Sequence, residues 1–173
     1  MHKENSQEEV IRRNSDRVYR LAFSLVKSGA DADDIYQDVF LQYLRRTPVF
    51  DSEEHEKAWF IRVTVNRCKN HWKSPWTKRR TALHEEAGPY GKMYVAGGVS
   101  SEGGSCTETA EESLILIETV KQLPEKYRVV IHLFYYEEMS VEEIGRATGS
   151  KASTVRTRLT RARRMLKDKL GGL

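Results

Sequence analysis

Residues 140–170 read SVEEIGRATGSKASTVRTRLTRARRMLKDKL, and they carry the densest set of local structural signals in the chain. Ser140 and Glu143 have the spacing of a capping box, which predicts that a helix begins there. Gly149 suits a sharp turn at the end of that helix, and Ser153 is the expected cap of the next one. Two short helices joined in this way indicate a helix-turn-helix.

The second of these helices is strongly basic. Residues 153–169 carry seven Lys or Arg and one acid. Their apolar stripe is Val155, Leu159, Ala162 and Leu166. Arg156, Thr157 and Arg161 face away from that stripe, where guanidinium groups can reach phosphates or guanine edges. DNA binding is therefore predicted, and the alternative is a solvated basic face without a ligand.

A second basic stretch, residues 57–80, reads KAWFIRVTVNRCKNHWKSPWTKRR and holds eight Lys or Arg, three Trp and no acid. A helix over residues 58–73 would have one apolar stripe, formed by Ala58, Ile61, Val65, Cys68 and Trp72. The face beside it holds cations and amides, namely Arg62, Asn66, Lys69, Asn70 and Lys73. Amides can read base edges, and Trp59 at the border could stack on an unpaired base. Two alternatives are that Trp59 and Phe60 are core residues beside solubilising cations, or that the helix lies on a membrane surface.

The composition divides the chain in two. Residues 81–113 hold six of the eleven glycines and no sustained apolar period, which is typical of a flexible linker. The flanking regions have helical periodicity, which predicts helices over residues 7–27 and 31–46. Gly29 is expected to end the first of these helices. We therefore expect an all-α protein with a helical N-terminal domain at residues 1–80, a linker at 81–107 and a four-helix C-terminal domain at 108–173.

The overall composition narrows the class of protein. The chain has 173 residues, a formal net charge of +4 and two cysteines, which fits a reducing compartment without a disulfide framework. No apolar run is long enough to span a membrane, and the polar N-terminus lacks the core of a signal peptide. We expect a cytoplasmic protein without membrane insertion.

Signatures of catalysis are missing from the sequence. It has no Gly-rich phosphate loop, no HExxH motif and no Ser-His-Asp order in a suitable context. Cys68 and His71 lie three residues apart and, with His84 and Cys106, make a possible metal-ligand set. However, Cys68 belongs to the apolar stripe, where a thiol behaves as a small hydrophobe. We expect no catalytic residue, no metal and no cofactor.

Three motifs, taken in order, resemble the extracytoplasmic-function (ECF, group 4) sigma factors of bacterial RNA polymerase. They are DADDIYQDVFLQYLRR, AWFIRVTVNRCKNHWK and LPEKYRVVIHLFYYEEMSVEEIGRATGSKASTVRTRLTRARRML. The resemblance covers nearly the whole chain outside the linker. It implies a protein that binds core RNA polymerase, directs it to promoters and performs no chemistry itself. It also implies an anti-sigma protein as a partner, often a membrane-bound one.

The resemblance further implies roles for individual positions. A helix that docks on the polymerase clamp coiled coil would carry Asp34, Ile35, Gln37, Asp38 and Phe40. The surface that recognises and melts the downstream (minus-ten) promoter element would carry Phe50, Trp59, Arg62, Asn66, Lys69, Asn70 and Lys73. Phe50 and Asn66 match a pocket for a flipped base of the single strand. The residues that read the duplex of the upstream (minus-thirty-five) element would be Lys151, Ser153, Thr154, Arg156, Thr157, Arg158 and Arg161.

Three positions depart from the family pattern. Gly145 replaces the common Ala, Ser150 stands where many members have Ile or Val, and Thr64 replaces a usual Ala. The first two predict a looser helix-turn-helix. The alternative function is a stand-alone helix-turn-helix regulator, which would need the C-terminal module alone and would leave the acidic helix at residues 31–46 without a role.

Overall fold

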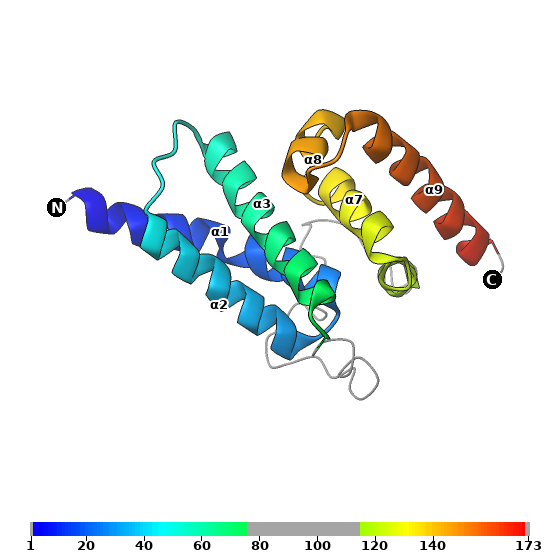
Figure 1. The fold of residues 1–173 in the computed structure, drawn as a ribbon, viewed down its shortest axis with the longest axis horizontal. Helices are drawn as coiled ribbons and strands as arrows, with labels where there is room; N and C mark the ends of the chain where they lie inside the picture. Colours follow the sequence, from blue (N-terminus) through cyan, green and yellow to red (C-terminus); the bar gives the residue numbers. More distant parts are fainter. Residues whose placement is uncertain (1, 76–114, 172–173) are drawn as a thin grey trace, which may run out of the picture. The chain divides into compact units, whose positions relative to one another are not determined.

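Helices make up both parts of the chain that the structure describes. The computed structural model describes residues 2–75 and 115–171, and these ranges contain α-helices joined by short turns, with no β-strand (Figure 1). The chain separates into two compact units, Met1–Lys92 and Met93–Leu173. The predicted all-α fold is confirmed.

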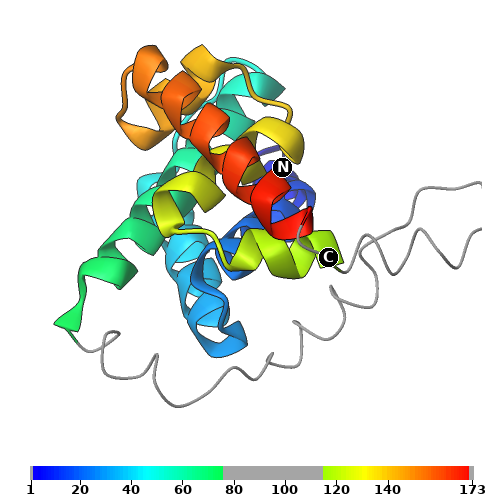
Figure 2. The same ribbon diagram turned by 90° about the vertical axis from the view of Figure 1, so that its right-hand side faces the viewer.

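The first unit packs three helices so that each contacts the other two (Figure 2). They are α1 (His2–Val26), α2 (Gly29–Arg46) and α3 (Glu53–Lys73). Ser28 and Ser52 cap α2 and α3, because their side chains accept hydrogen bonds from the backbone N–H groups of Asp31 and His55. These two caps set where α2 and α3 begin.

The turn between α1 and α2 differs from the prediction. Gly29 does not end α1; it is the first residue of α2. Lys27 takes the left-handed conformation instead, with φ at 63°, and its N–H donates to the Phe23 carbonyl at 3.0 Å. Because Ser28 caps α2, that helix begins two residues before the expected Asp31.

The predicted apolar stripe of α3 is buried at its centre. Ile61, Val65 and Cys68 are at most 1% exposed, whereas Ala58 and Trp72 at the two ends are half-buried. The stripe thus faces α1 and α2, which leaves the opposite side of α3 for a ligand.

Phe60 widens this core beyond the predicted stripe. Its ring is fully buried and lies 5.5 Å from the Phe40 ring and 5.3 Å from the Tyr43 ring, measured between centroids. The interpretation of Phe60 as a core residue is therefore correct. Buried aromatic clusters of this kind contribute strongly to stability through their large apolar area.

A buried polar cluster joins α1 to α3. The Glu56 carboxylate is 5% exposed and accepts hydrogen bonds from Arg13 Nε at 3.0 Å and Arg13 Nη2 at 2.8 Å. The fully buried Asn14 amide donates to the same carboxylate. The hydrogen bond with Glu56 raises the pKa of Arg13 above its ordinary value. Because a buried carboxylate without its partners is costly, this cluster fixes one arrangement of α1 on α3.

Within the described residues, the second unit contains four helices. They are a helix over residues 115–121, α7 (Glu125–Tyr135), α8 (Val141–Thr148) and α9 (Ala152–Leu170). The predicted capping box is present, since Ser140 Oγ accepts from the Glu143 N–H at 3.2 Å and the Glu143 carboxylate accepts from the Ser140 N–H at 2.7 Å. The prediction that Ser153 caps α9 is wrong, because α9 begins after Lys151 and Ser153 lies in its first turn.

Gly145 and Ser150, the two departures from the family pattern within the helix-turn-helix, both make close contacts. Gly149 ends α8 with φ at 67°. A Cβ added at Gly145 would lie 2.8 Å from the Ser150 carbonyl oxygen, so only glycine allows this approach without a shift. The Ser150 N–H donates to the Gly145 carbonyl at 2.9 Å, and Ser150 Oγ accepts from Arg158 Nη1 at 3.2 Å. The two departures from the family pattern therefore support close contacts rather than a looser turn.

Candidate protein and nucleic-acid interfaces

The candidate polymerase-binding residues fall into two groups on α2. Asp34, Gln37 and Asp38 are exposed, whereas Ile35 and Phe40 are 4% and 7% exposed and belong to the core. Ile35 and Phe40 therefore anchor the helix and do not form its outer surface. The three polar side chains, at spacings of three and four, share one outward face.

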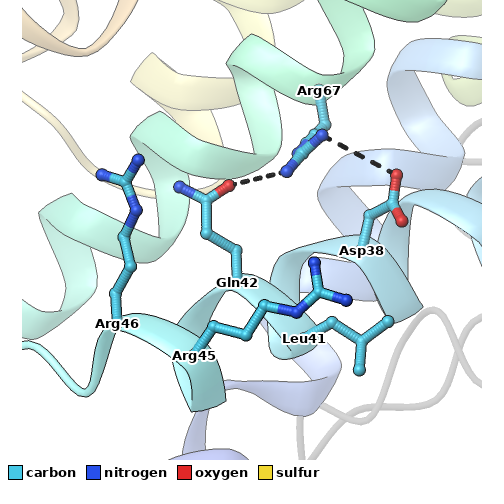
Figure 3. Close-up of a pocket in the computed structure, with 6 residues that line it drawn as sticks. All are labelled: Asp38, Leu41, Gln42, Arg45, Arg46 and Arg67. Atoms are coloured by element: carbon cyan, nitrogen blue, oxygen red, sulfur yellow. Dashed lines mark hydrogen bonds and ion pairs between the residues drawn. The ribbon is translucent and has the colours of Figure 1, made fainter.

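The same face of α2 continues into a groove against α3. Arg67 of α3 reaches across it, with Nη2 2.9 Å from Gln42 Oε1 and Nη1 3.9 Å from Asp38 Oδ2. Figure 3 shows the six side chains that line this groove, which are Asp38, Leu41, Gln42, Arg45, Arg46 and Arg67.

Two exposed leucines of α2 were missed by the sequence analysis. Leu41 and Leu44 are 46% and 45% exposed, and they follow Asp34 by seven and ten residues, so they extend its face. The signal that could have found them is their position outside the apolar period that Ile35, Val39 and Tyr43 define. Exposed apolar side chains beside arginines suit a protein interface, because interface cores are apolar and arginine is enriched there.

The cationic and amide face predicted for α3 is exposed as expected. Arg62, Asn66, Asn70 and Lys73 are exposed and Lys69 is half-buried. They lie on the side of α3 away from the buried stripe, so one continuous surface offers cations for phosphates and amides for base edges.

Aromatic side chains border this face where the α2–α3 connection meets α3. The Phe50 ring stacks on the Tyr43 ring at 6.3 Å and meets the Trp59 ring edge-on at 5.9 Å. Phe50 and Trp59 are half-buried, so each retains some accessible surface. Burial raises the pKa of the Tyr43 hydroxyl above its ordinary value. Val49, next to Phe50, is 85% exposed.

The predicted DNA-reading residues of the second unit lie mostly on the open side of α9 and the turn before it. Lys151, Ser153, Arg156, Thr157 and Arg161 are exposed, and Thr154 and Arg158 are half-buried. The stripe of Val155, Leu159 and Ala162 is buried as expected, and Leu166 is half-buried. The helix is therefore apolar toward its own unit and cationic toward solvent.

A shallow hollow in this surface includes residues from a different helix. It is lined by Lys126, Tyr127, Ser153, Thr154, Thr157, Arg158 and Arg161. Lys126 and Tyr127 belong to the first turn of α7, and no local signal linked them to α9. They add a cation and an aromatic ring to the candidate DNA surface.

One arginine of α9 has a structural contact instead. Arg163 Nε donates to the Tyr135 hydroxyl at 2.7 Å, and the guanidinium lies over the Phe134 and Tyr135 rings at 5.2 and 5.6 Å. Cation–π contacts of this kind hold α9 against α7. Arg163 thus packs on α7 and is not assigned to the candidate DNA surface of α9.

The alternative metal-ligand set gains no support from the described residues. Cys68 is fully buried in the core, and His71 Nε2 lies 3.3 Å from Asp31 Oδ2. The other two members, His84 and Cys106, lie outside the described residues. The described part of the chain contains no group of three or more His, Cys, Asp or Glu that could hold a metal ion.

None of the helices described is long and apolar enough to cross a bilayer.

Comparison with known families places two conserved regions on these two units. The Sigma-70 region 2 family matches residues 10–78, and the Sigma-70 region 4 family matches residues 113–166. The first match contains the α2 and α3 surfaces, and the second contains the helix-turn-helix.

Individual relatives agree with these matches. The ECF RNA polymerase sigma factor SigW of Bacillus subtilis is 31% identical over 91% of this chain and 85% of its own length. The ECF RNA polymerase sigma factor SigE of Mycolicibacterium smegmatis is 32% identical over 95% of this chain, which spans 62% of that relative's length. The ECF RNA polymerase sigma-E factor of Escherichia coli K12 is 27% identical over 93% of this chain and 84% of its own length.

Solved structures share the fold. The sigma factor RpoE of Bartonella quintana, in complex with the anti-sigma factor NepR, aligns with a TM-score of 0.63 at 20% identity, covering 98% of each chain. CnrH, in complex with the cytosolic domain of CnrY, aligns with a TM-score of 0.64 at 20% identity, covering 98% of this chain and 90% of its own.

The region 2 match removes the case for a stand-alone regulator, because such a protein would need only the helix-turn-helix. Two conserved sigma regions and a relative that is 31% identical over 85% of its length point to one family. Sigma factors recruit polymerase to promoters and are not enzymes. The chain belongs to the ECF sigma factors of bacterial RNA polymerase, and it is an alternative sigma factor that binds core polymerase and directs promoter-specific initiation of transcription.

Proposed function

We propose that three surfaces divide the work of initiation in this sigma factor. The outer face of α2 binds the clamp coiled coil of core polymerase, the polar face of α3 holds and opens the minus-ten element, and the open face of α9 reads the minus-thirty-five element. The observation that carries this assignment is that each helix buries its apolar stripe and exposes a separate, chemically distinct face.

The exposed chemistry of α2 supports polymerase binding. Asp34, Gln37 and Asp38 offer acceptors on one face, and Leu41 and Leu44 add apolar area that is already exposed. Apolar anchors among polar groups are what a specific protein interface needs. Ile35 and Phe40 act indirectly, because they hold α2 in the core.

The face of α3 supports binding of melted DNA. Arg62, Lys69 and Lys73 carry the charge that a phosphate backbone requires, and Asn66 and Asn70 lie between them. Extruding a base from the stack costs a few kcal/mol. Stacking on an aromatic ring at the border, offered by Phe50 or Trp59, would offset part of that cost.

The exposed residues of α9 support readout of duplex DNA. Arg156, Thr157 and Arg161 are exposed in the first ten residues of α9, and a helix-turn-helix places the N-terminal part of its second helix in the major groove. Lys126, near the same hollow, adds a phosphate contact from α7.

Joining two DNA-binding units in one chain raises the effective concentration of the second contact once the first has formed. We expect the units to act as the domains at residues 1–80 and 108–173, joined by the linker at 81–107. The single contacts can then be weak while the whole promoter is recognised tightly.

An anti-sigma protein is the proposed regulator. The relative from Bartonella quintana was solved as a complex with an anti-sigma factor, and a protein that covered the outer face of α2 would block polymerase. We also propose that the protein works in the cytoplasm, where core polymerase and the chromosome are found.

The assignment is tested by separating polymerase binding from promoter use. Three sets of alanine substitutions, one on each proposed surface, are assayed for affinity to core polymerase and for transcript yield. We expect the α2 set to lose core affinity, and the α3 and α9 sets to keep core affinity while losing transcripts. If the α9 set lost affinity for core polymerase and the α2 set kept it, the proposed division of roles would be contradicted.

A further inference from the structure

An acid on the first helix of the helix-turn-helix holds an arginine of the second. Glu142 Oε1 of α8 lies 2.9 Å from Arg156 Nη2 of α9, which is within hydrogen-bond distance. The two side chains are 56% and 60% exposed, so the pair lies at the surface. Fourteen residues separate them in sequence, so the turn at Gly149 is what brings them together.

This contact leaves Arg156 able to bind a base. A guanidinium has five N–H donors in a planar fork, and the contact with Glu142 uses Nη2. Recognition of guanine needs two parallel donors directed at O6 and N7. A carboxylate that accepts from one Nη group restricts the orientation of the guanidinium, so its remaining donors point in fewer directions.

The pairing also changes the conformational cost of recognition. A free arginine at the surface samples many rotamers, and binding a base restricts it to one. A carboxylate that restricts the side chain beforehand removes part of that cost, which is the usual benefit of preorganisation. The benefit applies to a base that requires one direction of the fork and much less to a phosphate, which accepts contacts from many directions.

We propose that Glu142 is a specificity-determining residue that acts by positioning Arg156 for base readout. This inference rests on the proposed role of Arg156 in reading the minus-thirty-five element. Glu142 does not contact DNA in this account. Its neighbour Glu143 has a different task, because it closes the capping box of α8.

The effect is expected to be modest and measurable. Exposed ion pairs contribute little, equivalent to a change of roughly two- to fivefold in an equilibrium constant. We expect Glu142→Ala to lower selectivity for the intact upstream element by about that factor, while Arg156→Ala lowers it further. Glu142→Gln keeps an acceptor oxygen for Nη2 and is expected to stay within about twofold of the original selectivity.

The test uses the full-length protein bound to core polymerase. Its affinity is measured for a promoter fragment that drives specific starts, with the upstream element either intact or scrambled, and selectivity is the ratio of the two affinities. The matched control is Asp168→Asn, which makes the same charge change as Glu142→Gln on the exposed end of α9. Asp168 lies twelve residues beyond Arg156, about 18 Å along the helix, farther than the screening length of about 8 Å at physiological salt.

A double-mutant cycle decides whether Glu142 acts through Arg156. We expect Glu142→Ala to reduce the selectivity ratio, and we expect no further reduction when Glu142→Ala is added to Arg156→Ala. Asp168→Asn should leave the ratio unchanged. An unchanged ratio in Glu142→Ala, beside a reduced ratio in Arg156→Ala, would overturn the positioning role and leave the proposed function intact. An unchanged ratio in Arg156→Ala would overturn both. The positioning role would also be overturned if Glu142→Ala reduced the selectivity ratio equally in the presence and absence of Arg156. The same holds if Glu142→Gln and Glu142→Ala reduced the ratio equally.

Discussion

Gly145 shows how much one side chain controls the recognition unit. It lies where α8 passes closest to the start of α9, and an added Cβ would meet the Ser150 carbonyl oxygen at 2.8 Å. That oxygen belongs to the backbone, so relief requires a shift of the turn itself. The direction of α9, and with it the proposed DNA-facing side chains of that helix, therefore depends on this position.

We predict that Gly145→Ala lowers the free energy of local unfolding of α8 and α9 by about 1–3 kcal/mol, the usual cost of overpacking. Hydrogen exchange of the amides of these two helices in the full chain measures this directly. Arg164→Ala, at an exposed position of α9, is the control and should stay within about 0.5 kcal/mol. Unchanged protection in Gly145→Ala would show that the turn relaxes freely.

A second prediction at this scale concerns Arg156 and Arg161, two exposed arginines of α9. Arg156→Ala and Arg161→Ala should each reduce transcript yield from a specific promoter by about tenfold or more, because a good arginine–guanine contact contributes roughly 1–3 kcal/mol of discrimination. Both variants should bind core polymerase normally. Arg163→Ala serves as a comparison, since that residue packs on Phe134 and Tyr135. If Arg156→Ala and Arg161→Ala both gave full transcript yield, these two arginines would not belong to the surface that reads DNA.

At the scale of helices, some local signals in the sequence were sufficient and others were misleading. The capping box at Ser140 and the turn at Gly149 were both predictable, because all their partners lie within a few residues. The signals at Gly29 and Ser153 were misleading, because Gly29 begins α2 and α9 begins after Lys151, which makes no side-chain cap hydrogen bond.

Features that join distant segments could not be predicted in the same way. Glu56 meets Arg13 across 43 residues, and no pattern around either residue indicates the pair. The division of the α2 residues into exposed Asp34 and buried Ile35 required the packing of α1 and α3. The resemblance implied a polymerase-binding role for α2, and the structure distinguishes the exposed residues of that helix from its core.

The outer face of α2 gives a prediction at the scale of an element. Asp34→Ala combined with Gln37→Ala should weaken binding to core polymerase by about tenfold, because truncating well-placed interface residues typically costs more than about 1 kcal/mol. Glu54→Ala, an exposed acid at the start of α3, is the control. The affinity is measured by titrating labelled protein with core polymerase. An unchanged affinity in the double variant would exclude this face from the interface.

The polar face of α3 gives a separate prediction. Arg62→Ala combined with Asn66→Ala should leave core binding intact and reduce the fraction of open promoter complex, because cation and amide contacts to the displaced strand are lost. Reactivity of unpaired thymines to permanganate measures that fraction. A premelted promoter, with mismatched bases at the downstream element, should restore part of the transcript yield. Normal melting by the double variant would place strand capture elsewhere.

At the scale of the whole molecule, the design separates two tasks that one rigid domain would have to combine. In the proposed division of roles, the first unit would carry the protein-binding face on α2 and the strand-binding face on α3. A shared core and the Arg13–Glu56 cluster fix the helices of this unit relative to one another. The second unit would carry α9, the helix proposed to read the duplex. Tethering them lets modest contacts add through effective concentration.

The most direct test of this account is transcription in vitro with the purified protein, core RNA polymerase and fragments of the host genome, followed by mapping of RNA 5′ ends. We predict discrete start sites that appear only when the protein is added. Two sequence elements should recur upstream of them, one near each proposed contact. Starts that are equally frequent without the protein, or scattered without shared elements, would contradict its role in directing polymerase to promoters.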